Sequence, residues 1–306
     1  MELSGREKLD FVGDIHANSR KLLILLEKLG YKNTEAGWVH PDNRQLVVLG
    51  DFINVGSDNH QTLEILYKMW MNKSAYIILG NHEYFLAWYF FKHGSSAFTS
   101  PKSPLFPDYE TLLSEFSKNI DELCVYAEWL MCLPLYIKNV KFRAVHACWS
   151  EENIEQLSKY KNLNELFLSF NGEKPKKEKK LKRAINETVE GKKMSLYING
   201  KIEKPVKLRV KWWQSIYNKP LTQSILTNKP VKYPDVTITP EIFPDFNPYE
   251  ETERPIFFGH YWFQSLPYLL RNNACCLDFG AAKGGYLSAY RWDGEMQLDA
   301  GKIVYV

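Results

Sequence analysis

Several short apolar stretches of this chain end in the same way, with a glycine followed directly by an aspartate, asparagine or histidine. Three of them, residues 9–12, 45–49 and 75–79, alternate with segments that carry helical signals. Strands linked through helices run parallel, and their carboxyl ends then meet at one edge of the sheet. Ligand-binding groups collect at that edge. The pattern therefore predicts a parallel βαβ unit with a polar site beside it.

The two segments between these strands carry helix start and stop signals. Leucines recur over residues 22–29, Asn18 or Ser19 can cap the helix, and Gly30 can end it. The second segment, residues 58–67, opens on an aspartate with a glutamine three residues later, which favours a capped helix start. We expect a helix in both segments.

The rest of the chain predicts further strands and one basic region. Residues 140–145 and the apolar residues 255–258 predict two strands that end at a histidine and at a Gly-His pair, whereas residues 274–305 alternate and favour antiparallel hairpins. Residues 173–183 carry seven cations against two acids, which indicates either a solvated loop or a patch that meets an anionic substrate. Residues 204–213 alternate apolar and basic residues, as a strand with one basic face would.

Composition narrows the class of protein without naming a function. The chain has 306 residues, is 45% hydrophobic and has a formal net charge of +3, so it can bury a large core and does not overall indicate nucleic acid as a partner. No apolar leader and no run of ~18 apolar residues is visible, so we expect no signal peptide and no membrane partner. The five cysteines lack disulfide-framework spacing, which favours a cytoplasmic protein with reduced thiols.

The polar residues at the strand ends are the strongest functional signal. They are Asp14, His16, Asp51, Asn81, His82, His146 and His260. Aspartate, asparagine and neutral histidine are ligands for divalent metals such as manganese, iron or zinc. Two such ions that share one carboxylate can clamp a phosphoryl group and ionise a bridging water, while an imidazolium protonates the leaving oxygen. The set indicates a two-metal phosphoesterase site.

The motifs "GDIHANS", "GDFINVG", "GNHE", "VHAC" and "GHYW" occur in this order over most of the chain. The series resembles that of the calcineurin-like metallophosphoesterases, closest to the phosphoprotein phosphatase branch and its bacterial relatives, which include symmetrical diadenosine tetraphosphatases. The ending "CLDFGAAKGGYLSAYRWDGE" is similar to that of the bacterial members. The resemblance implies an α/β fold: a β-sandwich of two mixed sheets flanked by helices. It also implies one domain over residues 1–306, with an inserted cap at about 150–254.

The resemblance also implies a role for each residue at the strand ends. Asp14 and His16 would bind the first metal, Asp51 would bridge both metals, and Asn81, His146 and His260 would complete the second. Asn81 would also contact the substrate, and His82 would be the acid for the leaving group. Glu83 would brace the site through hydrogen bonds. We expect two divalent ions, with manganese first and iron, zinc or nickel as alternatives.

The second motif departs from the family pattern at two positions. Asn54 stands where an aspartate orients the histidine acid, and Val55 stands where an arginine grips phosphate. Asn54 can still hydrogen-bond to His82, but it cannot stabilise an imidazolium as a carboxylate would. Another cation should then contact the phosphate. We expect Arg209, on the basic face of the alternating strand, or as second choice Lys283, in the Gly-rich turn "GAAKGG".

The function predicted from the sequence is hydrolysis of a phosphomonoester by a hydroxide bound to two metals. A phosphoprotein phosphatase, a dinucleoside polyphosphate hydrolase and a nucleic-acid end phosphatase are the rivals within the enzymes. Outside them, the rival is a module that keeps metals and binds phosphate without turnover. The expected partner is a phosphorylated protein or nucleotide, with nucleic acid left open.

Overall fold

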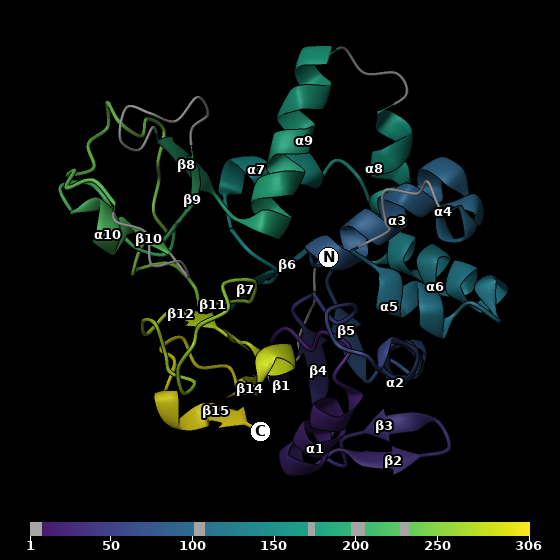
Figure 1. Cartoon of the computed structure of the whole chain (residues 1–306). Helices are drawn as coiled ribbons and strands as arrows, with labels where there is room; N and C mark the ends of the chain where they lie inside the picture. The colour runs from purple at the N-terminus through teal and green to yellow at the C-terminus, as the bar shows by residue number, and fades with distance from the viewer. Residues whose placement is uncertain (1–7, 101–107, 171–174, 197–205, 227–232) are drawn as a thin grey trace.

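Two β-sheets packed face to face form the centre of the protein in the computed structural model, which describes residues 8–100, 108–170, 175–196, 206–226 and 233–306. The first sheet has the order β13 (Asp278–Phe279), β14 (Tyr286–Trp292), β1 (Leu9–Val12), β4 (Gln45–Val48) and β5 (Ala75–Ile77), with β15 (Ile303–Tyr305) beside β14. The second has the order β12 (Ala274–Cys276), β11 (Ile256–Phe258), β7 (Arg143–Val145) and β6 (Tyr136–Lys138). This is the predicted α/β sandwich of two mixed sheets (Figure 1).

The predicted βαβ unit is confirmed. Strand β1 pairs with β4 in parallel, and β4 pairs with β5 in parallel. The connections are α1 (Ser19–Leu29) and α2 (Asn59–Met71). Asn18 caps α1 by accepting the Lys21 N–H, and Gly30 ends it in the left-handed conformation. A small hairpin, β2 (Lys32–Thr34) with β3 (Gly37–Val39), follows α1.

Alternation of side chains explains why these strands are apolar throughout. In β4, Val47 faces the space between the two sheets, whereas Leu46 and Val48 face the helices outside. The inner space is filled largely by aromatic rings, including Phe11 of β1 stacked on Phe257 of β11 with centroids 3.7 Å apart. Because both faces of each strand are buried, the period of two is invisible in the sequence.

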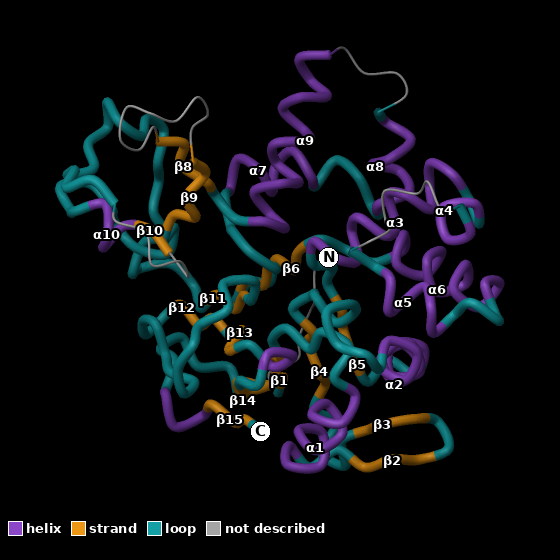
Figure 2. Tube along the Cα trace, viewed as in Figure 1, coloured by secondary structure: helices purple, strands orange, loops and turns teal. Residues whose placement is uncertain are grey.

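Helices cover the outer face of the first sheet. Besides α1 and α2 they include α3 (Asn81–His93) and α6 (Ile120–Cys132), with the shorter α4 (Ser96–Thr99) and α5 (Glu110–Glu115). Figure 2 shows these helices on one side of the strands. None of the helices within the described residues is long and apolar enough to cross a membrane.

The chain between β7 and β11 adds a further group of elements. It holds α7 (Glu151–Leu157), α8 (Leu163–Ser169), α9 (Pro175–Glu190), β8 (Lys193–Leu196), β9 (Val206–Val210), α10 (Leu221–Ser224) and β10 (Ile225–Leu226). Of these, α8 and α9 pack on the same core as α3 and α6. Strands β10, β9 and β8 form a sheet of their own. In Figure 1 this sheet lies on the far side of α9 from α3. Alternation in β9 is as predicted, with Leu208 and Val210 buried and Lys207 exposed; residues 204–205 lie outside the described part.

The structure corrects three expectations. The lysine-rich run forms helix α9 from Pro175 onward, not a loop, because Leu181, Ile185 and Val189 form an apolar stripe that packs on the core. Asp58 makes no capping hydrogen bond, since its carboxylate accepts from Ser19 instead, and α2 extends to Met71. Strand β12 pairs in parallel with β11, so residues 274–305 are not all hairpins.

Candidate active site

The loops that follow β1, β4, β5, β7 and β11 meet at one edge of the sandwich. They bring together all seven polar residues that the sequence singled out. Backbone hydrogen bonds join the loops: the N–H groups of Ile15 and His16 donate to Asp51 O, and the Gly259 N–H donates to His146 O. Residues almost 250 positions apart in the chain therefore face one cavity of about 170 Å³.

Asp51 lies at the centre of this arrangement. Its Oδ2 is 3.3 Å from His146 Nε2, 3.9 Å from His16 Nε2 and 4.0 Å from His82 Nε2. Asp14 Oδ2 is likewise 3.9 Å from His16 Nε2. Two groups of side chains could each hold a metal ion: Asp51 with His16 and His82, and Asp51 with His146 and His260. Asp51 belongs to both groups, as a bridging ligand would.

Buried polar atoms that lack a hydrogen-bond partner indicate whether the site residues could bind metal ions. Asn81 Oδ1, His146 Nε2 and His260 Nε2 are buried and make no hydrogen bond. Such atoms are costly to bury unless something else satisfies them. The His146 Nδ1–H donates to Leu49 O at 2.7 Å, which leaves Nε2 free to act as a ligand. These donors fit divalent cations of the transition series.

Burial and neighbouring charges favour the ligand forms of Asp51 and His260. Burial raises the pKa of Asp51, but His146, His82 and His16 act against it and hold that pKa well below its usual range. Burial, followed by His146 and Arg209, lowers the pKa of His260 well below its usual range. Asp51 is therefore anionic and His260 neutral near pH 7.

Glycines before the ligands make the close packing of the site feasible. A Cβ atom on Gly80 would clash with Asp51 Oδ1, and a Cβ on Gly259 would clash with Asp14 Oδ1. Gly80 and Gly259 thus leave room for a carboxylate delivered by another strand, whereas Gly13 and Gly50 leave room for the backbone of Leu277 and of Gly80.

Glu83 supports the loop after β4 from beneath. Its fully buried carboxylate accepts hydrogen bonds from the backbone N–H groups of Asp51, Phe52, Ile53 and Gly80, at 2.8–3.0 Å. These bonds hold a strained segment, because Asp51, Asn54 and Val55 have φ of 47°, 67° and 70°. A positive φ is unusual for aspartate and a genuine outlier for valine.

Asn54 contacts His82 in a way that sets the state of the imidazole. Its Nδ2 donates to His82 Nδ1 at 3.0 Å and to Asp108 O at 2.7 Å. Because an amide N–H can only donate, Nδ1 of His82 is the acceptor and the ring proton is on Nε2, which faces Asp51. Burial, the largest cause, lowers the pKa of His82. An amide in place of a carboxylate therefore favours a neutral His82.

Both predicted phosphate contacts line the cavity. Arg209, on β9, donates from Nη1 to His260 O at 3.3 Å, and the ammonium of Lys283 lies 4.0 Å from the centre of the Trp262 ring. Val55 is 47% exposed at the mouth of the same cavity. The positions of both cations come from long-range packing.

Sequence reasoning missed Asp278. This buried residue also lines the cavity, and it accepts from the Trp262 N–H at 2.6 Å and the Gly280 N–H at 3.1 Å. Burial, then Asp278 and Asp51, raise the pKa of Asp14. The signal was present in "CLDFG", where Asp278 follows an apolar strand as the other site residues do.

The sandwich of two mixed sheets, with its carboxylate and histidine cluster, is that of a metal-binding hydrolase of phosphoric esters. Residues 8–262 match the family model of the calcineurin-like phosphoesterases, and the chain belongs to that family. The resemblance seen in the motifs is thereby confirmed. Members of the family bind divalent metals, and the His/Asp cluster can hold them.

Similar proteins act on different phosphate compounds. The chain is 30% identical over 172 residues to the asymmetrical bis(5'-nucleosyl)-tetraphosphatase PrpE of Oceanobacillus iheyensis, a match that covers 54% of this chain and 66% of the relative. It is 39% identical over 75 residues to PrpE of a Geobacillus species, covering 24% of this chain and 31% of the relative. The chain thus spans less than two thirds of either relative.

A solved structure shows the same fold over the whole chain. It is a protein serine/threonine phosphatase of Saccharomyces cerevisiae with similarity to human phosphatase PP5. The TM-score is 0.52 with 14% sequence identity, and the match covers 100% of this chain and 82% of the other. At that identity the likeness concerns the fold alone.

Proposed function

We propose that the protein hydrolyses phosphomonoesters at this site with two divalent metal ions, manganese first. The observation that carries the proposal is the set of three buried, unpartnered ligand atoms around the Asp51 carboxylate. Asp14 and His16 would hold one ion, Asp51 would bridge, and Asn81, His146 and His260 would hold the other. Ions held there would neutralise phosphoryl charge and activate water for attack on phosphorus.

Other residues of the chain would bind the phosphate and protonate the leaving oxygen. Arg209 would donate to phosphate oxygens that face away from the carboxylates, and Lys283 would add positive charge at the mouth of the cavity. The cationic form of His82 would donate its Nε2 proton to the leaving oxygen, and Asn54 would hold the neutral ring that remains. Asn81 would contact both metal and substrate. The residues at about 150–254 would act as an inserted cap on a single domain, since β9 brings Arg209 to the site.

A dinucleoside polyphosphate hydrolase is the second candidate. The names of the PrpE relatives favour it. A phosphorylated protein is the alternative substrate, in line with the name of the phosphatase that shares the fold. A nucleic-acid end phosphatase and a phosphate-binding module without turnover remain the further alternatives.

A substrate panel tests the proposal. The purified protein with manganese would be given p-nitrophenyl phosphate, phosphopeptides, diadenosine tetraphosphate and oligonucleotides phosphorylated at the 5′ or 3′ end. We expect turnover of monoesters. Faster turnover of the dinucleotide would favour the second candidate. Bound manganese without turnover of any compound would identify a binding module and reject hydrolysis.

A further inference from the structure

A second cavity is lined by His82 like the first, but not by Asp14 or Asp51. It has a volume of about 600 Å³, within the range of small-molecule sites. Val55, Asn81 and His82 line both cavities, so these three residues form the boundary between them. The two cavities therefore adjoin at the residue proposed to protonate the leaving oxygen.

The two cavities differ in charge. The first contains Arg209 and Lys283 besides the carboxylates of Asp14, Asp51 and Asp278, whose charge the proposed metal ions would offset. Among the described residues that line the second, none is a lysine or an arginine, and the charged ones are Asp108 and Glu110, both exposed. With metal ions bound, a phosphoryl group is favoured in the first cavity, whereas the acidic side chains that face an anion in the described part of the second, Asp108 and Glu110, would repel it.

The second cavity is also aromatic. Phe85 and Tyr89, half-buried on successive turns of α3, line it together with Tyr109. Tyr109 is buried, and its hydroxyl donates to His82 O at 2.8 Å, so its ring is held beside His82 with centroids 6.1 Å apart. Exposed Val55 adds an apolar edge. Rings and an apolar edge suit a flat, uncharged group.

The chemistry of the ester places one end of the substrate in each cavity. The oxygen of water bonds to phosphorus, and the bond from phosphorus to the leaving oxygen breaks, with both electrons going to that oxygen. His82 supplies the proton, and solvent takes up the proton that water releases and reloads the imidazole. The leaving oxygen must therefore lie within reach of His82 Nε2, and the rest of the leaving group can extend past Val55, Asn81 and His82, which also line the second cavity.

We propose, on the basis of the phosphomonoesterase function above, that this cavity binds the leaving group and selects an aromatic group that carries no negative charge. The substrate class is then a monoester of an aromatic alcohol or phenol with a neutral or cationic remainder. Dinucleoside polyphosphates fit poorly, because their leaving group carries phosphate into a cavity rimmed by carboxylates.

Three esters with matched leaving groups test the charge preference. They are the phosphates of 4-(2-aminoethyl)phenol, 4-ethylphenol and 3-(4-hydroxyphenyl)propionic acid, in which two methylene groups insulate the phenol from the charge. We expect kcat/KM with manganese to fall in the order cationic, neutral, anionic, by about 10-fold from first to last. Equal rates for all three would overturn the inference while leaving the phosphomonoesterase function intact. Hydrolysis of none of the three, nor of p-nitrophenyl phosphate, would overturn both.

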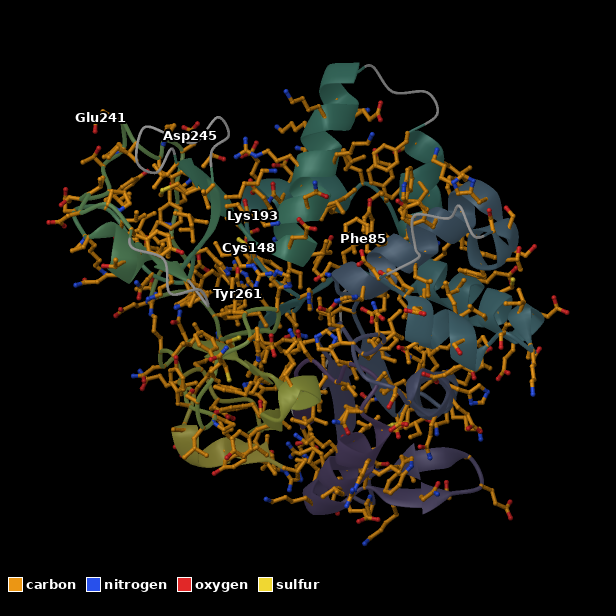
Figure 3. All side chains as sticks on the ribbon, in the orientation of Figure 1. Phe85, Cys148, Lys193, Glu241, Asp245 and Tyr261 are labelled. Carbon is orange, nitrogen blue, oxygen red and sulfur yellow. The ribbon has the colours of Figure 1, made fainter. Side chains whose placement is uncertain are left out.

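Two double variants assign the preference to this cavity. Asp108→Asn with Glu110→Gln removes both rim carboxylates and should bring the three rates within about 2-fold of one another. Glu241→Gln with Asp245→Asn makes the same change of charge at exposed residues on the opposite side of the molecule from Phe85 (Figure 3). This control should keep the 10-fold range. Loss of the range in the control, or its persistence in the first variant, would show that another part of the molecule sets the preference.

The aromatic preference has its own test. Tyr89→Ala should raise KM for 4-ethylphenyl phosphate about 10-fold and leave kcat/KM for ethyl phosphate within 2-fold. Tyr89→Phe keeps the ring and should restore the KM. Equal losses on both esters, or no recovery in Tyr89→Phe, would remove the ring from leaving-group binding.

Discussion

Two sides of the site differ in how far solvent reaches them, although Glu83 accepts backbone hydrogen bonds from both. The ligand wall, which we define as Asp14, Asp51, His146 and His260, is at most 8% exposed, and glycines, Glu83 and shared backbone hydrogen bonds position it. The clamp loop, residues 52–55, ends in an exposed valine. Metal ligation needs every donor in place, whereas a phosphate contact can come from another element. The difference explains how this chain can keep its ligand set and lose the usual arginine.

Asp51→Asn is the substitution that we expect to disrupt the ligand wall most. The shared carboxylate becomes neutral, so two neighbouring cations lose the charge that offsets their repulsion. We expect turnover of p-nitrophenyl phosphate to fall at least ~10³-fold. Metal content, measured on the purified variant, should fall as well. Activity near the wild-type level would contradict the two-metal assignment.

Glu83→Gln tests whether activity and stability depend on the backbone hydrogen bonds that Glu83 accepts beneath the ligand wall. The amide replaces one acceptor oxygen by a donor that faces backbone N–H groups. We expect activity to fall about 100-fold and the free energy of unfolding to fall by about 2–4 kcal/mol. Denaturant unfolding followed by circular dichroism measures the second quantity. An unchanged midpoint would show that the four hydrogen bonds do not hold the loop.

Arg209→Ala tests whether a cation from β9 replaces the arginine missing from the clamp loop. We expect kcat/KM for p-nitrophenyl phosphate to fall ~10–100-fold, about one charge-assisted hydrogen bond to phosphate. Lys283→Ala should cost only about 3-fold, since its ammonium is already engaged with the Trp262 ring. Metal content should stay the same in both. If both variants have wild-type kinetics, neither cation contacts the substrate.

Asn54→Asp restores the carboxylate beside His82 and should change the pH profile. Burial lowers the pKa of His82, so its cationic form is present only below an already depressed pKa. A carboxylate that accepts from Nδ1–H would raise that pKa, and activity on alkyl esters would then persist to higher pH. The rate on p-nitrophenyl phosphate should change less, because its leaving group needs little protonation. A pH profile that does not move toward higher pH would show that the residue at position 54 does not set the pKa of His82.

Val55→Gly is expected to have the smallest effect, on stability. A β-branched residue at φ 70° is strained by about 1–3 kcal/mol, and the entropy cost of glycine offsets about 0.5–1 kcal/mol of the relief. We therefore expect the free energy of unfolding to rise by about 1 kcal/mol, measured by urea denaturation. A decrease would mean that contacts of the valine side chain outweigh the backbone strain.

The sequence alone determined the fold class and the set of candidate ligands. Strand ends are local features: an apolar run, a glycine and a polar residue lie next to one another in the chain, and parallel pairing brings such ends to one edge. That is why Asp14, Asp51 and His260 could be predicted to lie together, and why helix α1 could be placed from its cap and its final glycine.

Only the tertiary structure decided the features that depend on distant contacts. Helix α9 was hidden because its charges outnumber the apolar stripe of Leu181, Ile185 and Val189, which is recognisable only once a core lies against it. The position of Arg209 beside His260 depends on how β9 packs, and the cavity beyond His82 arises where α3 meets the residues that precede α5. Such contacts join residues tens of positions apart, and no spacing within one segment encodes them.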